Sequence, residues 1–170
     1  MELLVVLLVI GILLAIAIPT YLHVTGSAAD RVAQVNITNA LTVENEYYTS
    51  NQQYTSNLST LASLEPAISW AGSPPQASIA LQVGQVGIQA VSSNSSVNDA
   101  VVIMALSSTG TCFFLGEEAL PGSYAQGSWY TESTGNASGA CTYPTQIQTR
   151  PLSSNPPTGP GSASRWGSSW

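Results

Sequence analysis

An unbroken apolar run near the N-terminus constrains this chain more than any other feature. The run covers residues 3–18, LLVVLLVIGILLAIAI, sixteen residues without a polar side chain. As a helix it would be about 24 Å long, slightly shorter than the roughly 30 Å thickness of the hydrocarbon core, which normally takes about 20 residues to span. Tyr21 and Leu22 extend the apolar stretch past Pro19. The run therefore predicts a helix that lipid or other protein must cover.

Two ordinary explanations of such a run are a cleaved secretory signal and a simple membrane anchor. A signal has an apolar region of this length, and residues 15–17, Ala-Ile-Ala, match the small-residue pattern of a cleavage site. However, Glu2 places an acid where signals carry a Lys or Arg. An anchor would hold the rest of the chain as a periplasmic or surface domain.

The composition excludes some classes of function. Charged residues make up 7% of the 170 residues, against roughly 25% in an ordinary soluble domain. With three Arg, no Lys and a net charge of −6, the chain cannot neutralise a row of phosphates, so sequence-specific nucleic-acid binding by a basic surface is excluded. No phosphate-binding loop, dinucleotide fingerprint or nucleophile motif occurs, and His23 is the only histidine. We therefore expect no enzyme, no cofactor and no metal site.

The N-terminal segment closely resembles that of bacterial type IV pilins. Members of that family carry a glutamate just after the processing site, then a hydrophobic helix, and then a proline about five helical turns after the glutamate. Glu2 and Pro19 occupy those two positions in register with the apolar run. One departure is that only Met1 precedes Glu2, whereas the family has a basic leader and a few mature residues there. We expect the leader and the first residues of the mature chain, which would precede Met1, to be missing from this sequence.

The resemblance assigns assembly roles to Glu2, Gly11 and Pro19. It implies that the Glu2 carboxylate pairs with the N-terminal amine of a neighbouring subunit, although a first-turn acid can also simply complement the helix dipole. Pro19 lacks an amide hydrogen and disfavours a helix interior, and Gly11 weakens the same helix. Because the helix of assembled pilins melts before this proline, we expect a kink or an unwound stretch between Gly11 and Pro19.

The rest of the chain predicts an α+β fold shaped like a ladle, with the long helix packed on an antiparallel sheet. After Pro19 apolar residues recur at spacings of three and four, so the helix is expected to end near Thr49. A short helix is expected at 58–64. Alternating apolar residues predict strands at four places, namely 78–83, 86–91, 100–106 and 111–115. We divide the chain into a stalk (1–53), a head (54–149) and a Pro/Gly/Ser-rich tail (150–170).

Cys112 and Cys141 are the only cysteines, with 28 residues between them. In an exported protein a disulfide is the default for such a pair, and two free buried thiols are the alternative. A two-cysteine metal site is disfavoured because no His lies nearby. The resemblance implies that the enclosed loop forms much of the exposed, variable surface of the head.

The adjacent residues Glu117 and Glu118 are the remaining candidates for acid/base chemistry. They would point to opposite faces of a strand and so do not form an acid/base pair.

Possible glycosylation sites follow from Asn-X-Ser/Thr matches at Asn57, Asn94 and Asn136. A fourth match, at Asn36, falls on the predicted helix and is a poor acceptor. The abundant Ser and Thr would also allow O-glycosylation of the head.

Taken with the resemblance, these features favour a structural subunit that polymerises into an extracellular type IV pilus filament. The implied partners are identical subunits in a helical homopolymer, the cytoplasmic (inner) membrane before assembly, the pilus assembly machinery and the prepilin peptidase, which processes and methylates such chains. Adhesion, twitching motility or DNA uptake would be properties of the whole fibre at the cell surface. Two alternatives remain open: a minor pilin or type II secretion pseudopilin, and a membrane-anchored surface domain that never polymerises.

Overall fold

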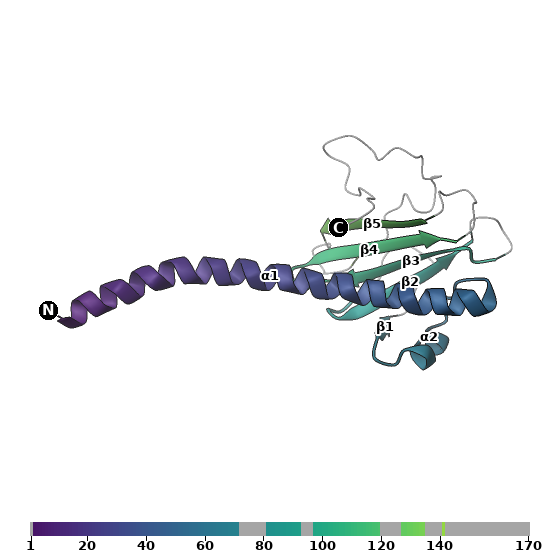
Figure 1. Ribbon diagram of the computed structural model, residues 1–170, viewed down its shortest axis with the longest axis horizontal. Helices are drawn as coiled ribbons and strands as arrows, with labels where there is room; N and C mark the ends of the chain where they lie inside the picture. Colours follow the sequence, from purple (N-terminus) through teal and green to yellow (C-terminus); the bar gives the residue numbers. More distant parts are fainter. Residues whose placement is uncertain (1, 72–80, 93–96, 120–126, 135–140, 142–170) are drawn as a thin grey trace, which may run out of the picture.

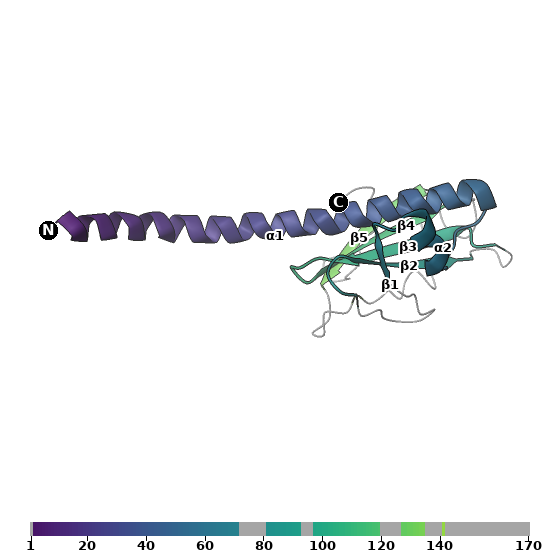
Figure 2. The same ribbon diagram turned by 90° about the horizontal axis from the view of Figure 1, so that it is seen from below.

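A long helix and a five-stranded sheet make up the computed structural model, which describes residues 2–71, 81–92, 97–119, 127–134 and 141. The C-terminal half of the helix lies across one face of the sheet, and its N-terminal half extends away from the sheet as a free rod (Figures 1 and 2). The predicted α+β, pilin-like layout is therefore confirmed. The predicted tail, 150–170, lies outside the described residues.

The sheet has the strand order β1-β2-β3-β4-β5. Neighbouring strands pair antiparallel except β1, which runs parallel to β2. The elements, in chain order, are α1 (Glu2–Asn51), α2 (Leu58–Leu64), β1 (Ser69–Ala71), β2 (Gln85–Val91), β3 (Ala100–Leu106), β4 (Thr111–Glu118) and β5 (Gly127–Thr134).

The helix α1 is continuous, so the predicted unwound stretch between Gly11 and Pro19 is wrong for this structure. Figure 1 shows a gentle curve over the N-terminal half of α1 in place of a sharp kink. Pro19 removes one amide donor, the one that would pair with the carbonyl of Ala15. One residue later, the Thr20 hydroxyl donates to the Ile16 carbonyl at 3.0 Å and gives that oxygen a second partner. The local loss is therefore confined to a single hydrogen bond.

Four sequence predictions of short elements agree with the structure: α2 at 58–64, β2 at 86–91, β3 at 100–106 and the strand at 111–115, which β4 continues to Glu118. The strand predicted at 78–83 is wrong where it is described, because Leu81 and Gln82 have no regular structure and a turn follows. There the Gln82 amide donates to Gln85 Oε1 at 2.9 Å, and the Gln85 amide donates to the Gln82 carbonyl at 3.0 Å. Gly84, with φ of 88°, completes this turn. The Gln82 amide and carbonyl are therefore bonded within the turn and do not pair with a neighbouring strand.

Two strands, β1 and β5, were not predicted. β1 is only three residues long and exists through its pairing with β2, in which Trp70 lies opposite Val86. β5 has the polar sequence GSWYTEST, without the apolar alternation of a strand, and pairs along its whole length with β4. The sheet is consequently wider than predicted and not purely antiparallel.

Buried side chains pack on both faces of the sheet. Phe113 and Leu115 of β4 point toward α1, whereas Cys112 and Phe114 point to the opposite face. Every residue of β3 is buried, as expected of a central strand covered on both sides. From α1 the core facing the helix receives five apolar side chains, those of Ala33, Ile37, Ala40, Leu41 and Val43. This packing fixes which face of α1 meets the sheet.

Candidate functional site

The N-terminal half of α1 exposes a long apolar surface. No part of its most apolar 18-residue window is buried. Every large apolar residue from Leu3 to Ile18 is at least 46% exposed, with Leu3 at 80% and Ile10 at 46%. An exposed apolar patch larger than a few hundred Å² is unusual for a soluble monomer and marks a membrane or protein contact. We regard this surface, residues 3–18, as the candidate functional site and call it the apolar rod.

Among the described helices, α1 is the one long and apolar enough to cross a membrane by length and composition. A disulfide in the head adds a second indication, since disulfides persist in oxidising compartments. Together these features indicate a membrane-associated or secreted protein.

The three predicted assembly residues all lie on this uncovered half of α1. Glu2 is exposed in the first turn, where a carboxylate complements the positive end of the helix dipole. A Cβ built on Gly11 meets no atom within 4 Å, so the subunit alone gives no packing reason for this glycine. Pro19 lies inside the helix. The three residues are spread along the rod and form no common site; Glu2 and Pro19 are about 25 Å apart along the axis.

Exposed apolar residues continue along α1 past Pro19, first on the stretch before the head and then beside the head. Tyr21 is 70% exposed and Val24 61% exposed. Further along, Val32 and Val35 are 59% and 55% exposed. These valines were not predicted as surface residues, although their spacings of eight and eleven residues from Val24 place them near one helical face. The surface that needs covering is therefore longer than the apolar rod.

The head holds α1 at the point where the helix leaves the sheet. The Thr109 hydroxyl, in the turn between β3 and β4, donates to Asp30 Oδ1 at 2.6 Å. Two further hydroxyls, Ser107 Oγ and Thr111 Oγ1, each lie 3.1 Å from Thr109 Oγ1. Toward the N-terminus from this contact, α1 leaves the sheet, and no part of its most apolar 18-residue window is buried.

At the other end of the head, the buried carboxyl of Glu44 joins α1 to the segment that follows it. Glu44 is fully buried, and its Oε2 accepts from the Thr55 amide at 3.0 Å. Oε1 has no hydrogen-bond partner among the residues that the model describes. Burial raises the pKa of Glu44 from 4.5 to about 7, and the Thr55 hydrogen bond only partly opposes this rise. Its position, four residues after Ala40 and seven after Ile37, places Glu44 on the buried face of the predicted helix, a signal in the sequence that we had not used.

Tyr54 connects the same segment to the sheet. Its hydroxyl lies 3.2 Å from Asn45 Oδ1 on α1 and 3.4 Å from Glu117 Oε1 on β4. Glu117 Oε2 also accepts from the Ser128 hydroxyl of β5 at 3.2 Å. Burial, followed by the charge of Glu117, raises the pKa of the Tyr54 phenol well above its usual value. This network ties α1, β4 and β5 together and has a structural role.

Glu117 and Glu118 point to opposite faces of β4, as predicted: Glu117 reaches Tyr54 on the helix side, and Glu118 is buried on the other.

The predicted disulfide between Cys112 and Cys141 is present, with a Cα–Cα distance of 5.6 Å. Both cysteines are fully buried, and they pack against apolar side chains that include Met104. In the described part of the enclosed loop, β4 is mainly buried, whereas β5 carries the exposed Ser128 and Glu132. The expectation that this loop forms much of the exposed surface stays a prediction, because residues 120–126 and 135–140 lie outside the described residues.

Of the three possible glycosylation sites, only Asn57 lies within the described residues. Its side chain caps α2, with Oδ1 accepting from the amides of Ser59 and Thr60 at 3.1 and 3.3 Å. Asn57 is exposed, so its amide nitrogen is accessible to modification. Asn94 and Asn136 lie outside the described residues, and so does the side chain of His23.

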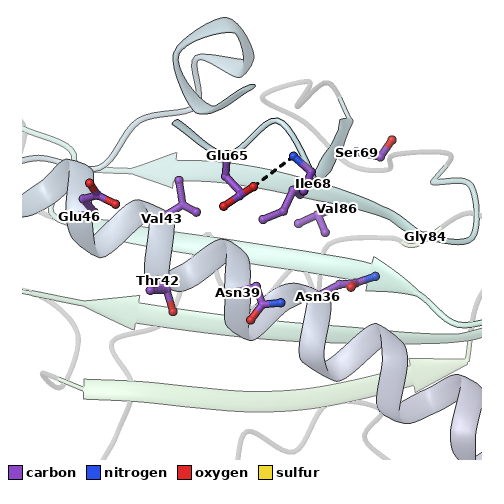
Figure 3. A pocket seen from close by; sticks show the side chains of 11 residues that line it. Asn36, Asn39, Thr42, Val43, Glu46, Glu65, Ile68, Ser69, Gly84 and Val86 are labelled. Atoms are coloured by element: carbon purple, nitrogen blue, oxygen red, sulfur yellow. Dashed lines mark hydrogen bonds between the residues drawn. The ribbon is translucent and has the colours of Figure 1, made fainter. Parts of the chain in front are cut away.

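An open groove of about 500 Å³ runs between α1 and the edge formed by β1 and β2 (Figure 3). Its walls are mixed: Asn36, Asn39 and Glu46 of α1 and Glu65 contribute polar groups, and Val43, Ile68 and Val86 contribute apolar ones. Glu65 Oε1 accepts from the amide of Ala67 at 3.2 Å. Within the described part of the chain, no group of three or more His, Cys, Asp or Glu is placed to hold a metal ion. We assign no ligand to this groove.

Comparison of the chain with protein-family models, with curated proteins and with solved structures finds no match. The functional argument therefore depends on the residues and the architecture described above.

Proposed function

We propose that this chain is a structural subunit that polymerises into an extracellular type IV pilus filament. The observation that carries the proposal is the uncovered apolar rod, which follows the acid Glu2 and extends from an α+β head of pilin-like layout. Such a rod needs cover from lipid before assembly and from identical rods afterwards. In this proposal the role is structural, and no reaction is assigned to the chain.

Close packing of apolar side chains would drive the assembly. Lipid tails and neighbouring rods are equally apolar, so the gain on leaving the membrane comes from many small dispersion contacts. A helical polymer requires two different surfaces that meet without closing into a ring, and a rod offset from its head can supply both. The prepilin peptidase and the assembly machinery would act on the N-terminal segment, and the cell surface would be the final location.

The first test is electron microscopy of material sheared from cells that produce the chain, with mass spectrometry of the subunit. We expect uniform thin filaments composed mainly of this protein. The subunit mass would also reveal any residues before Met1, N-terminal methylation and attached sugars. A chain that stays in the membrane without filaments would favour the anchored-domain alternative, and rare incorporation into filaments of another subunit would favour a minor pilin.

A second test uses Glu2. Replacing this residue by Ala or Gln should abolish incorporation into filaments, because the acid is part of the proposed assembly surface. Glu132→Gln is the matched control, since Glu132 is an exposed acid on β5 far along the chain from the rod. Filaments at normal yield from Glu2→Ala would contradict the pilin proposal.

A further inference from the structure

We propose that Thr109 is a latch that holds α1 straight against the head, and that α1 bends at residues 25–27 when this latch opens. The sequence there is Thr25-Gly26-Ser27, between the apolar rod and the part of α1 that packs on the sheet. The inference concerns the angle between rod and head, and it applies to a pilus subunit and to an anchored domain alike. It therefore goes beyond the proposed function.

Thr109 contacts α1 through both branches of its side chain. Its hydroxyl donates to Asp30 Oδ1 at 2.6 Å, and a hydrogen bond to a carboxylate is among the stronger kinds. Its methyl carbon lies 3.6 Å from the position that a Cβ on Gly26 would occupy. Gly26 and Asp30 are four residues apart, so Thr109 covers about one turn of α1. The contribution of α1 to the buried core begins only after this turn, at Ala33.

The turn that carries Thr109 is itself fixed. Ser107 is buried, and its hydroxyl accepts from the Thr109 amide at 3.3 Å. The Ser107 amide donates to the Thr111 carbonyl at 2.9 Å, and the Gly110 amide donates to the Ser107 carbonyl at 3.0 Å. Gly110 has a φ of 85°, a left-handed conformation that favours glycine. The head therefore presents the Thr109 side chain to α1 from a rigid support.

On the helix side of the latch, residues 25–27 form a weak part of α1. Gly, Ser and Thr are all poor helix formers, and sharp bends occur at Gly/Ser pairs. Thr25 and Ser27 are exposed, so water can pair with the backbone groups that a bend releases. A bend at Pro19, next to the apolar rod, would instead release such groups where lipid or other rods surround the helix, and neither offers them partners.

A bend at this point has a large effect because the rod is long. Residues 2–25 form about 35 Å of helix, so a bend of about 20° at their base would move the tip by about 12 Å. No part of the most apolar window of α1 is buried, so the head does not hold the rod there. The Thr109 latch thus sets the angle between the rod and the head.

Distances between rod and head, measured by pulsed EPR on the full chain in detergent, test the latch. Spin labels are attached at Leu14→Cys on the rod and Ala62→Cys on α2, both of which are exposed, while the native cysteines are paired. We expect one narrow distance distribution without further substitution. Thr109→Val keeps the shape of the side chain but removes the hydroxyl, and it should widen the distribution about twofold. Thr109→Ser keeps the hydroxyl and should leave the distribution narrow.

Two glycine substitutions locate the bend. Gly26→Ala strengthens the helix at 25–27, and a Cβ there makes only ordinary contacts, so in the Thr109→Val background it should restore the narrow distribution. Gly11→Ala is the matched control, because it strengthens the same helix inside the rod and should leave the distribution wide. Asp30→Ala should widen the distribution as Thr109→Val does. The two together should have no larger effect, since they remove the same hydrogen bond.

The outcomes are distinct from those that test filament formation. Equal widths with and without Thr109→Val would overturn the latch, and restoration by Gly11→Ala but not by Gly26→Ala would overturn the position of the bend. A second label pair within the head, at Ala62→Cys and the exposed Glu132→Cys, should keep its distance in every variant. A change in that distance with Thr109→Val would also overturn the proposal, because the head would then be the part that moves.

Discussion

Glu44 shows how one buried side chain can make the stability of this protein depend on pH. Its carboxyl is buried between α1 and the segment after it, and one oxygen accepts from the Thr55 amide. Because burial raises the pKa to about 7, the folded state holds the proton more tightly than the unfolded chain does. The stabilising effect of the protonated group is therefore complete below the ordinary pKa of 4.5 and is lost as pH rises through about 7.

We predict that the free energy of unfolding falls by about 3 kcal/mol between pH 4 and pH 8 through Glu44 alone, since each tenfold difference in proton affinity is about 1.4 kcal/mol. Glu44→Gln should remove this slope and make the protein more stable than wild type at pH 8. Denaturant unfolding of the full chain in detergent at several pH values measures the effect. Glu46→Gln, an exposed acid two residues away, is the control and should leave the slope unchanged. Equal slopes for wild type and Glu44→Gln would show that Glu44 titrates normally.

The element that carries the function, α1, keeps its helical form through Pro19 at a local cost. A proline in a helix interior is roughly 3 kcal/mol less favourable than alanine, and the carbonyl of Ala15 loses its amide donor. Pro19→Ala should therefore slow amide hydrogen exchange over residues 12–23 of the detergent-solubilised subunit. Gly11→Ala is a useful comparison, because its Cβ meets no atom and the expected gain is only about 1 kcal/mol. Unchanged exchange in Pro19→Ala would mean that the proline does not weaken α1.

The disulfide stabilises the sheet by tying β4 to a residue beyond β5. Replacing both Cys112 and Cys141 by Ser should lower the free energy of unfolding by about 3–4 kcal/mol, given the length of the closed loop. Since both sulfurs are fully buried, we also expect thiol reagents to reduce the native bond only as fast as the protein opens. Reduction rates measured with and without denaturant test this expectation. Rapid reduction of the native protein would show that the bond is accessible.

At the scale of the whole molecule, a head with a buried core is joined to an apolar rod whose side chains are exposed. The rod should therefore hold the unassembled chain in the membrane through an alkaline carbonate wash. Ile10→Arg places a charge in the middle of the apolar rod, at a cost of about 2.5–3.5 kcal/mol for a charged residue at a bilayer centre, and should shift the chain to the wash. Val35→Arg is the control, because Val35 is also exposed but lies beside the head. Loss of both variants from the membrane would point to misfolding, and retention of both would contradict a membrane role for the rod.

Features that depend on neighbouring residues along the chain were predictable from the sequence. The apolar run and the spacing of Ala33, Ile37 and Ala40 predicted α1, and the apolar patterns over 86–91, 100–106 and 111–115 predicted β2, β3 and β4; α2 was also predicted at its observed bounds. The Cys112–Cys141 bond followed from there being only two cysteines. These signals are local or involve a single possible pairing, so tertiary contacts have little freedom to change them.

Other features were decided by the tertiary structure. β1 and β5 exist because adjacent strands offer them hydrogen bonds, and 81–84 forms a turn because Gln82 and Gln85 bond to each other. Only the packing of α1 on the sheet makes Glu44 a buried acid and leaves the outer valines uncovered. Local sequence patterns determine which segments can be helices or strands, whereas hydrogen-bond partners and burial depend on which distant segments meet.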